Sequence, residues 1–221
     1  MAHSSMGGDA QKRPRSAMEG DKQQIKSGPS FMKLLVSDVT AGSIIGGKGS
    51  NIKKIQRQTG VLMRLSAGEV YFPGTHERIV IASGELESVK SAFVEVMNKQ
   101  KESTANNDMN GDFSAVSMQC KLVLPNSAIS IVIGKGGEAV KLLMSNTGAK
   151  VVASARQEQL QERIVTITGT FEQAQAAGLD LLTRVQEDTN LGPMIQNGSN
   201  RNFAKCLNRS NFLVFFFSQK L

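Results

Sequence analysis

An internal repeat is the feature of this sequence that most constrains its fold. The stretch Ala41–Gly49 (AGSIIGGKG) recurs 88 positions later as Ile129–Gly137 (ISIVIGKGG). The stretch Glu77–Val80 (ERIV) recurs 85 positions later as Glu162–Val165. Because the spacing changes by three between the two matches, a loop of variable length is predicted between them. The chain is therefore predicted to contain two copies of a module of about 70 residues.

The order of helices and strands is predicted to be the same in both copies. A β-rich apolar run opens each copy, at Phe31–Ser37 and at Cys120–Leu124. The periodicity then indicates two helices, two strands and a final helix. The expected fold class is α+β, a βααββα order that occurs twice, with a three-stranded antiparallel sheet packed against three helices in each copy. Gly178 falls inside the second final helix, where glycine costs about 1 kcal/mol relative to alanine.

Composition changes mark the borders of the copies. We expect a first module at 31–102, a polar linker at 103–118, a second module at 119–188, and largely disordered tails at 1–30 and 189–221. The formal net charge of +7 points to a polyanionic partner. The two tails together contribute +6 of this charge, so an anion site in the modules has to be found locally.

Several functional classes are disfavoured by the residue types present. Two cysteines, Cys120 and Cys206, and two histidines argue against a disulfide scaffold and against a metal site built from Cys or His. No Ser/His/Asp set or carboxylate pair recurs in both copies, so we expect no enzymatic activity, no cofactor and no metal. The longest apolar run, Phe212–Phe217, has six residues, whereas a membrane-spanning helix needs about 20. With no signal-peptide pattern at the N-terminus, a soluble intracellular protein is expected.

Four interpretations compete for the glycine clusters Gly46–Gly49 and Gly134–Gly137. A P-loop requires a hydroxyl residue where this chain has Gly49, and a glycine where the second copy has Ile129. A dinucleotide fingerprint fits the second copy alone, after a segment that is predicted to be helical. A plain tight turn explains one or two glycines, but not a lysine inside the loop in both copies.

The fourth interpretation is a G-x-x-G loop between two helices that binds a phosphate backbone. Glycine has no Cβ, so a phosphate chain can approach the loop closely. The helix that follows points its free N–H groups and the positive end of its dipole at the same anion. The lysine inside the loop, Lys48 or Lys135, adds charge at the contact.

At these residues the sequence resembles a known family. Ile45–Ile52 and Ile133–Val140 are similar to the I-G-x-x-G-x-x-[IV] signature of type I KH domains. Tyr71–Arg78, Leu124–Ser127 and Leu160–Arg163 resemble the Nova and poly(C)-binding branch of that family. The first loop departs from the usual Gly-Lys-Gly-Gly order. Relatives in this branch usually carry a third module, where this chain has the apolar run Asn211–Ser218.

The resemblance implies a set of site residues in each module. The RNA backbone would lie on the loops and the helix that follows, at Gly46, Gly47, Lys48, Gly49, Lys53, Gly134, Lys135, Gly136 and Gly137. The bases would lie in a groove formed by Gly42, Ile45, Ile52, Met63, Leu65, Arg78, Ile133, Val140, Val151 and Arg163, with Asp38 and Asn126 beside the arginines. The alternative is that the apolar residues are plain core and that the arginines pair with Glu77 and Glu162 on the surface.

The expected function is sequence-selective binding of single-stranded RNA. The resemblance implies short C-containing, pyrimidine-rich motifs and a role in pre-mRNA splicing or mRNA fate, in the nucleus, the cytoplasm or both. Single-stranded DNA binding, a protein-interaction scaffold and self-association through KH modules remain alternatives. Lys12–Arg15 is a weak nuclear-import candidate. Since the first loop is followed by Lys53, Lys54 and Arg57 with no acid nearby, we expect the first module to supply most of the salt-dependent affinity.

Overall fold

The computed structural model describes residues 30–105 and 117–187, and its elements follow the predicted order in both copies. The first module consists of β1 (Ser30–Val36), α1 (Asp38–Ile45), the short 3-10 turn η1 (Gly47–Gly49), α2 (Ser50–Thr59), β2 (Leu62–Leu65), β3 (Arg78–Gly84) and α3 (Leu86–Ala105). The second consists of β4 (Met118–Pro125), η3 (Asn126–Ala128), α4 (Ile129–Ile133), η4 (Lys135–Gly137), α5 (Glu138–Thr147), β5 (Lys150–Ala153), β6 (Glu162–Gly169) and α6 (Phe171–Glu187). The predicted α+β class and the βααββα order of each copy are confirmed.

Local chemistry accounts for several of the helix ends. The Ser37 hydroxyl accepts a hydrogen bond of 3.2 Å from the Thr40 N–H and so caps the start of α1. Gly60 and Gly148 end α2 and α5 in the left-handed conformation, with φ of 76° and 71°. This is the usual role of a glycine at the end of a helix, and it explains why a Thr-Gly pair occurs at the same place in both modules.

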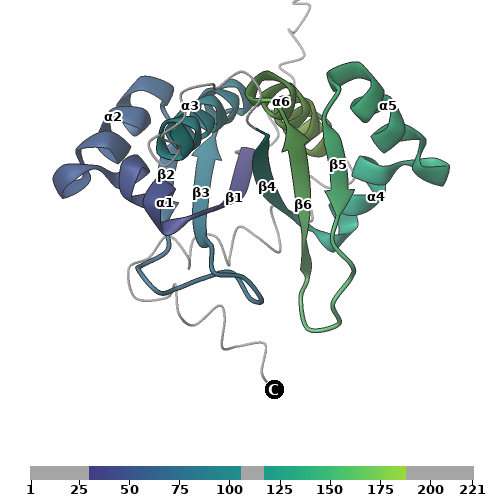
Figure 1. Ribbon diagram of the computed structural model, residues 1–221, viewed down its shortest axis with the longest axis horizontal. Coiled ribbons are helices and arrows are strands. Elements are labelled where there is room, and N and C mark those ends of the chain that lie inside the picture. Colours follow the sequence, from purple (N-terminus) through teal and green to yellow (C-terminus); the bar gives the residue numbers. More distant parts are fainter. Residues whose placement is uncertain (1–29, 106–116, 188–221) are drawn as a thin grey trace, which may run out of the picture.

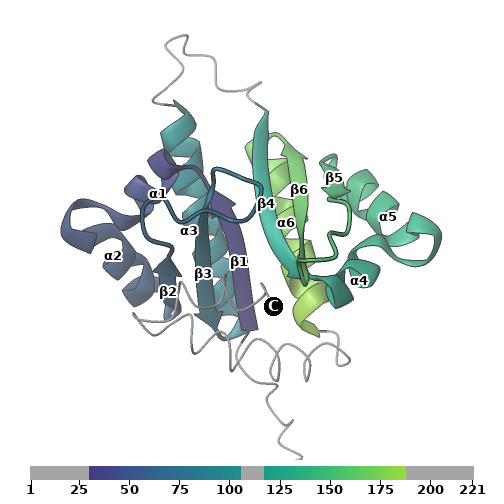
Figure 2. The same cartoon turned by 90° about the horizontal axis from the view of Figure 1, so that it is seen from below.

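The two modules share one sheet, which differs from the two separate three-stranded sheets that were expected. The strand order is β2-β3-β1-β4-β6-β5 (Figure 1). The additional contact is an antiparallel pairing of β1 with β4, in which Leu34 lies opposite Leu122 and Leu35 opposite Lys121. The edges β2 and β5 lie at opposite ends of this sheet, and α3 and α6 lie next to each other where the modules meet (Figures 1 and 2).

Apolar side chains pack on both faces of the shared sheet. The larger cluster lies between the strands and the helices and contains buried residues of both modules, such as Leu34, Phe93 and Leu122. Since neighbouring side chains on a strand point to opposite faces, the next residues along β1 and β4 belong to the other face. There, a smaller cluster joins Leu35, Phe72, Ile79, Ile81 and Val123. The modules therefore share a core on both sides of the β1–β4 junction.

The end of the first module differs from the expected border at residue 102. Helix α3 continues to Ala105, because Ser103 is 4% exposed and its hydroxyl donates a 2.7 Å hydrogen bond to the Lys99 carbonyl. Strand β4 begins at Met118, inside the expected linker. The expected tails, the remaining linker, Lys12–Arg15 and Phe212–Phe217 lie outside the described residues. Across 30–105 and 117–187, none of the helices combines the length and the apolar character needed to cross a bilayer.

Candidate nucleic-acid interface

The first glycine of each loop is required by the local geometry. Gly46 and Gly134 connect the loops to α1 and α4 with φ of 68° and 72°. A Cβ on Gly46 would lie 2.5 Å from Cγ of Asn51, and a Cβ on Gly134 would lie 2.5 Å from Cβ of Ala139. Both distances are far inside van der Waals contact. Glycine therefore lets the chain turn from one helix into the next at these two positions without displacing Asn51 or Ala139.

The middle of each loop is open to solvent. Gly47 and Lys48 in the first loop, and Lys135 and Gly136 in the second, are exposed. A Cβ on Gly47 or on Gly136 would meet nothing within 4 Å. Helices α2 and α5 begin directly after Gly49 and Gly137, and no side chain caps their first N–H groups. Each loop thus presents a bare backbone and the positive end of a helix to an incoming anion.

This geometry contradicts two of the alternative interpretations. A P-loop and a dinucleotide fingerprint both follow a strand, whereas α1 and α4 precede these loops. Among the described residues, no group of three or more His, Cys, Asp or Glu side chains is placed to hold a metal ion.

The cationic side chains are distributed unequally between the two loops. Lys48, Lys53, Lys54 and Arg57 are all exposed on η1 and α2, and the first turn of α2 carries no acid. The first turn of α5 carries Glu138, which lies next to the open helix end and opposes the positive charge of the loop. The first loop is therefore surrounded by more positive charge than the second.

The apolar residues that were predicted to form the base-binding floor divide into two groups. Ile45, Ile52, Leu65, Ile133 and Val140 are partly exposed, and Gly42 is exposed. In contrast, Met63 is 2% exposed and Val151 is 5% exposed, and both belong to the core between sheet and helices. The prediction of Met63 and Val151 as groove residues is corrected: their side chains are buried in the core between the sheet and the helices.

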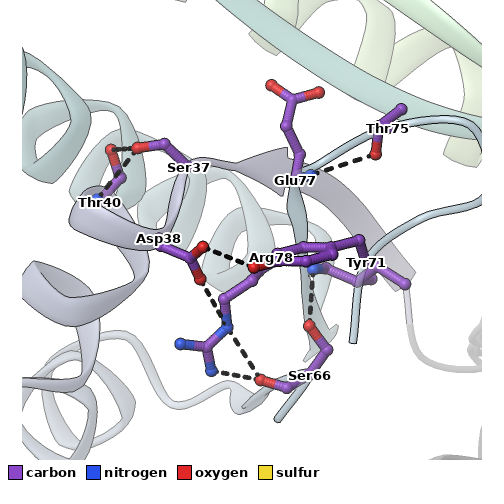
Figure 3. A network of polar contacts seen from close by, with 9 residues as sticks. Ser37, Asp38, Thr40, Ser66, Tyr71, Thr75, Glu77 and Arg78 are labelled. Carbon is purple, nitrogen blue, oxygen red and sulfur yellow. Dashed lines mark hydrogen bonds and ion pairs between the residues drawn. The ribbon is translucent and has the colours of Figure 1, made fainter. Parts of the chain in front are cut away.

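Arg78 lies in a polar network at the start of β3 (Figure 3). Its Nε donates to the Ser66 carbonyl at 3.1 Å, and its Nη2 donates to the same oxygen. Nε also lies 4.0 Å from Oδ1 of Asp38, whose other oxygen accepts a 2.9 Å hydrogen bond from the Tyr71 hydroxyl. The Arg78 side chain is 12% exposed and that of Asp38 is 54% exposed. The network holds a guanidinium donor and a carboxylate acceptor side by side.

The second module repeats the arginine but not the carboxylate. Nε of Arg163 donates to the Ser154 carbonyl at 2.6 Å, as Arg78 does to Ser66. Asn126 occupies the place of Asp38, and its Nδ2 donates to the Leu160 carbonyl at 2.9 Å. Oδ1 of Asn126 is buried and has no hydrogen-bond partner among the described residues. The two sites therefore share a donor and differ in the acceptor beside it.

The glutamates before the arginines do not pair with them, contrary to the surface-pair alternative. Glu77 binds Lys121 at 2.8 Å, and Glu162 binds Lys33 at 2.5 Å, so both ion pairs cross the junction between the modules. In Figure 3 the Glu77 carboxylate points away from Arg78. The repeat marks these lysines and glutamates as equivalent, but the pairing follows only from the β1–β4 contact.

Tyr71 is a site residue that was not predicted. It lies in the loop between β2 and β3, and its hydrogen bond to Asp38 raises the pKa of the phenol, with further contributions from burial and from the negative charges of Asp38 and Glu69. It is also the sole tyrosine of the chain, which contains no tryptophan. The sequence pointed to Tyr71 only through its place in the stretch Tyr71–Arg78. Its partner Asp38 is 33 positions away, so their hydrogen bond could not be seen in the local pattern.

Comparison with known proteins places these observations in a family. The sequence matches the KH domain family at residues 32–98 and 119–182. It is 36% identical to human RNA-binding protein Nova-2 over 182 residues, which cover 74% of this chain and 36% of Nova-2. It is 32% identical to the RNA-binding protein Pasilla of Drosophila melanogaster over 168 residues, which cover 73% of this chain and 22% of Pasilla.

Among solved structures, the first KH type I domain of human vigilin is similar, with a TM-score of 0.31 and 24% identity over 38% of this chain and 89% of that one. The family assignment rests on the sequence matches and on the two G-x-x-G loops. The chain thus spans about a third or less of the curated relatives it matches. Two βααββα modules, each with a glycine loop between its first two helices, match the same family, so the chain belongs to the KH-domain family.

Proposed function

We propose that this chain binds single-stranded RNA at two sites, one on each module, and selects short motifs that contain cytosine. The observation that carries the proposal is the repeated open loop at the start of α2 and of α5, with a lysine in each loop. The names of the two relatives, both RNA-binding proteins, support the part of the proposal that concerns RNA. A role in pre-mRNA splicing or mRNA fate, in the nucleus or cytoplasm, is the part of the proposal that rests on the resemblance to the Nova and poly(C)-binding branch.

Backbone binding follows from the loop geometry. Phosphate oxygens would accept hydrogen bonds from the loop N–H groups and from the first turn of α2 or α5, and Lys48, Lys53 and Lys135 would supply the counter-charge. Glycine at Gly47 and Gly136 keeps side chains out of the path of the ribose-phosphate chain. This contact does not depend on the base, so it supplies affinity and register.

Base selection is assigned to the arginine and the residue beside it. Cytosine presents an amino donor at N4 and an acceptor at N3, whereas uracil presents an acceptor at O4 and a donor at N3. In the first site, the Asp38 carboxylate would accept from the amino group and the Arg78 guanidinium would donate to the neighbouring acceptors. In the second site, Arg163 would donate in the same way, but the buried Oδ1 of Asn126 offers no exposed acceptor, so selection for cytosine is expected to be weaker there. The partly exposed Ile45, Ile52 and Leu65, and Ile133 and Val140, would support the flat faces of the bases.

The experiment replaces the middle of each loop with aspartates in the full chain: Gly47→Asp with Lys48→Asp, Lys135→Asp with Gly136→Asp, and all four together. RNA affinity is measured by fluorescence anisotropy on a labelled single-stranded RNA with two C-containing motifs. Each pair of changes is expected to weaken binding at least tenfold, and all four to abolish it. Unchanged binding in the fourfold variant would overturn the proposal.

A matched control makes the same change of charge elsewhere. Lys90→Asp with Ser91→Asp lies on α3, away from both loops and at the groove between α3 and α6, and removes one ion pair with Glu87. Such pairs contribute about 0–1 kcal/mol, so this variant should fold and bind RNA nearly as the wild type does. A single-stranded DNA of the same sequence tests the second candidate ligand, because tighter binding to DNA would replace RNA in the proposal.

A further inference from the structure

The junction between the modules is built around a pseudo-twofold axis. In the β1–β4 pairing, Leu34 lies opposite Leu122. Leu122 is the residue that corresponds to Leu34 in the second copy of the repeat, 88 positions later. The ion pair Lys33–Glu162 and the ion pair Lys121–Glu77 exchange under the same operation. Each module therefore presents nearly the same surface to the other.

A glutamine of each long helix also reaches across the junction, although the two glutamines lie one position out of the 85-residue register. Gln186 of α6 accepts from the Phe31 N–H at 3.1 Å and donates to the Phe31 carbonyl at 3.0 Å. Gln100 of α3 donates to the carbonyl of Gln119, the equivalent of Phe31, at 2.6 Å. The backbone pairs and the two ion pairs have equivalents between two first modules or two second modules, so they do not choose the partner. Lys101 of α3, which lies 4.3 Å from the centre of the Phe171 ring of α6, has no such equivalent and adds to the preference for unlike modules.

One contact on the axis breaks the symmetry. Phe93 of α3 and Gly178 of α6 are equivalents in the repeat, 85 positions apart, and they lie against each other. A Cβ on Gly178 would lie 2.3 Å from Cζ and 2.8 Å from Cε1 of Phe93. Phe93 is fully buried. The ring thus fills the space that the missing side chain of Gly178 leaves in α6.

The same contact cannot form between like modules. Two first modules would bring two Phe93 rings to one place on the axis, and close-packed interiors have no room for a second ring. Two second modules would leave a void, because a Gly178 would face a Gly178, and a void removes packing contacts on all its walls. Glycine in a helix interior is otherwise unfavourable, so the fit to Phe93 explains its presence in α6.

We infer that the Phe93–Gly178 contact selects the partner at this junction, so that the first module docks on the second and not on another copy of itself. The edge of β1 therefore pairs with β4 of the same chain. Self-association between two first modules or two second modules is disfavoured. The inference rests on the fit between α3 and α6 and does not depend on RNA binding.

The test exchanges the large and the small residue in the full chain. Phe93→Gly leaves glycine on both helices, Gly178→Phe places phenylalanine on both, and the double variant restores one of each. Docking is followed by amide hydrogen exchange across the β1–β4 pairing, at those amides of Leu34, Leu35, Lys121 and Leu122 that point to the other module. The ladders within each module, β1–β3 and β4–β6, report that the modules themselves remain folded.

Each single variant is expected to speed exchange at the β1–β4 amides at least tenfold, and the double variant to restore most of the protection. Mixing the two single variants should then give a complex of two chains in sedimentation, because phenylalanine on one chain finds glycine on the other, while each variant alone sediments as one chain. Wild-type exchange in both single variants, or two open single variants that do not associate when mixed, would overturn the inference.

A milder variant keeps the test valid if Gly178→Phe does not fold. Gly178→Ala adds only the Cβ that lies 2.3 Å from the Phe93 ring. Helix propensity alone predicts that this change stabilises the chain, whereas the contact predicts a lower thermal midpoint and faster exchange at the β1–β4 amides. Ala176→Gly, at an exposed position of the same helix, measures the effect of propensity without the contact. A raised midpoint for Gly178→Ala would overturn the inference.

Discussion

The two glycine loops follow one backbone path but place their lysine one position apart. The second loop has Gly136 where the first has Lys48, and both residues adopt positive φ, at 62° and 52°. The first loop is surrounded by exposed cations, while the second has Glu138 beside it. The difference shows which features the site geometry requires. The glycines at the two ends fix the path of the chain, whereas the lysine and the charge around it vary between the copies.

The largest expected effect is a difference in stability between variants of the first glycine of each loop. Gly134→Ala should destabilise the chain by about 3 kcal/mol or more, because strained φ contributes about 1–3 kcal/mol and the new Cβ meets Cβ and the backbone of Ala139. Gly46→Ala should cost less, since its Cβ meets only side-chain atoms of Asn51, although moving them breaks the 2.9 Å hydrogen bond from Nδ2 to the Ser43 carbonyl. Urea unfolding measures the free energy of unfolding of the two variants. An equal decrease in both would show that the two loops are equally rigid.

The salt dependence of RNA binding should distinguish the two sites next. The variant with Lys135→Asp and Gly136→Asp binds RNA through its first site alone, which has four exposed cations. The variant with Gly47→Asp and Lys48→Asp binds through its second site alone, which has two exposed cations and Glu138. Each phosphate contact on single strands contributes about −0.7 to the slope of log affinity against log salt. We expect the first site to show the steeper slope by about one to two such contacts. A steeper slope for the second site would contradict the assignment.

Asp38→Asn makes the first arginine network resemble the second. Removing the carboxylate should lower the pKa of Tyr71 toward its ordinary value of 10.0, because the hydrogen bond to Asp38 is the main cause of its rise. A phenol with a raised pKa adds stability that is present below its ordinary pKa and is lost as pH rises through the raised value. The variant should therefore lose less stability than the wild type above pH 10. Absorbance titration of the phenol follows Tyr71 alone, and an unchanged pKa would exclude the hydrogen bond.

The smallest effect is expected from exchanging the order of two loop residues. Gly47→Lys with Lys48→Gly gives the first loop the order of the second and keeps its charge. It removes a side chain from positive φ, where a residue other than glycine costs about 1–2 kcal/mol. The variant should be more stable by about 1 kcal/mol in urea unfolding, with RNA affinity changed less than twofold. A loss of stability would mean that Lys48 makes a favourable contact in its present place.

Local patterns in the sequence were sufficient for the fold of each module and for the loops. Periodicity, the Thr-Gly helix ends and the repeated glycines act over a few residues, so one sequence reveals them. The β1–β4 pairing, the Lys33–Glu162 bond and the fit of Phe93 to Gly178 depend on how two folded modules meet, which no periodicity records. The burial of Met63 and Val151 was missed for a related reason, since alternation on a strand shows which side chains share a face but not how deeply each is covered.

The two lysines in the middle of β1 and β4 have a consequence for the chain while it is being made. Strand β1 precedes β4, so the first module can complete its own strands while the outer edge of β1 still lacks its neighbour. An unpaired edge invites pairing with strands of other chains, and a charged residue on it discourages this. Lys33 and Lys121 place such a charge on each edge, and Glu162 and Glu77 supply the counter-charge once the modules meet. Lys33 and Lys121 thus discourage aggregation before the modules meet, and they form the ion pairs across the junction afterwards.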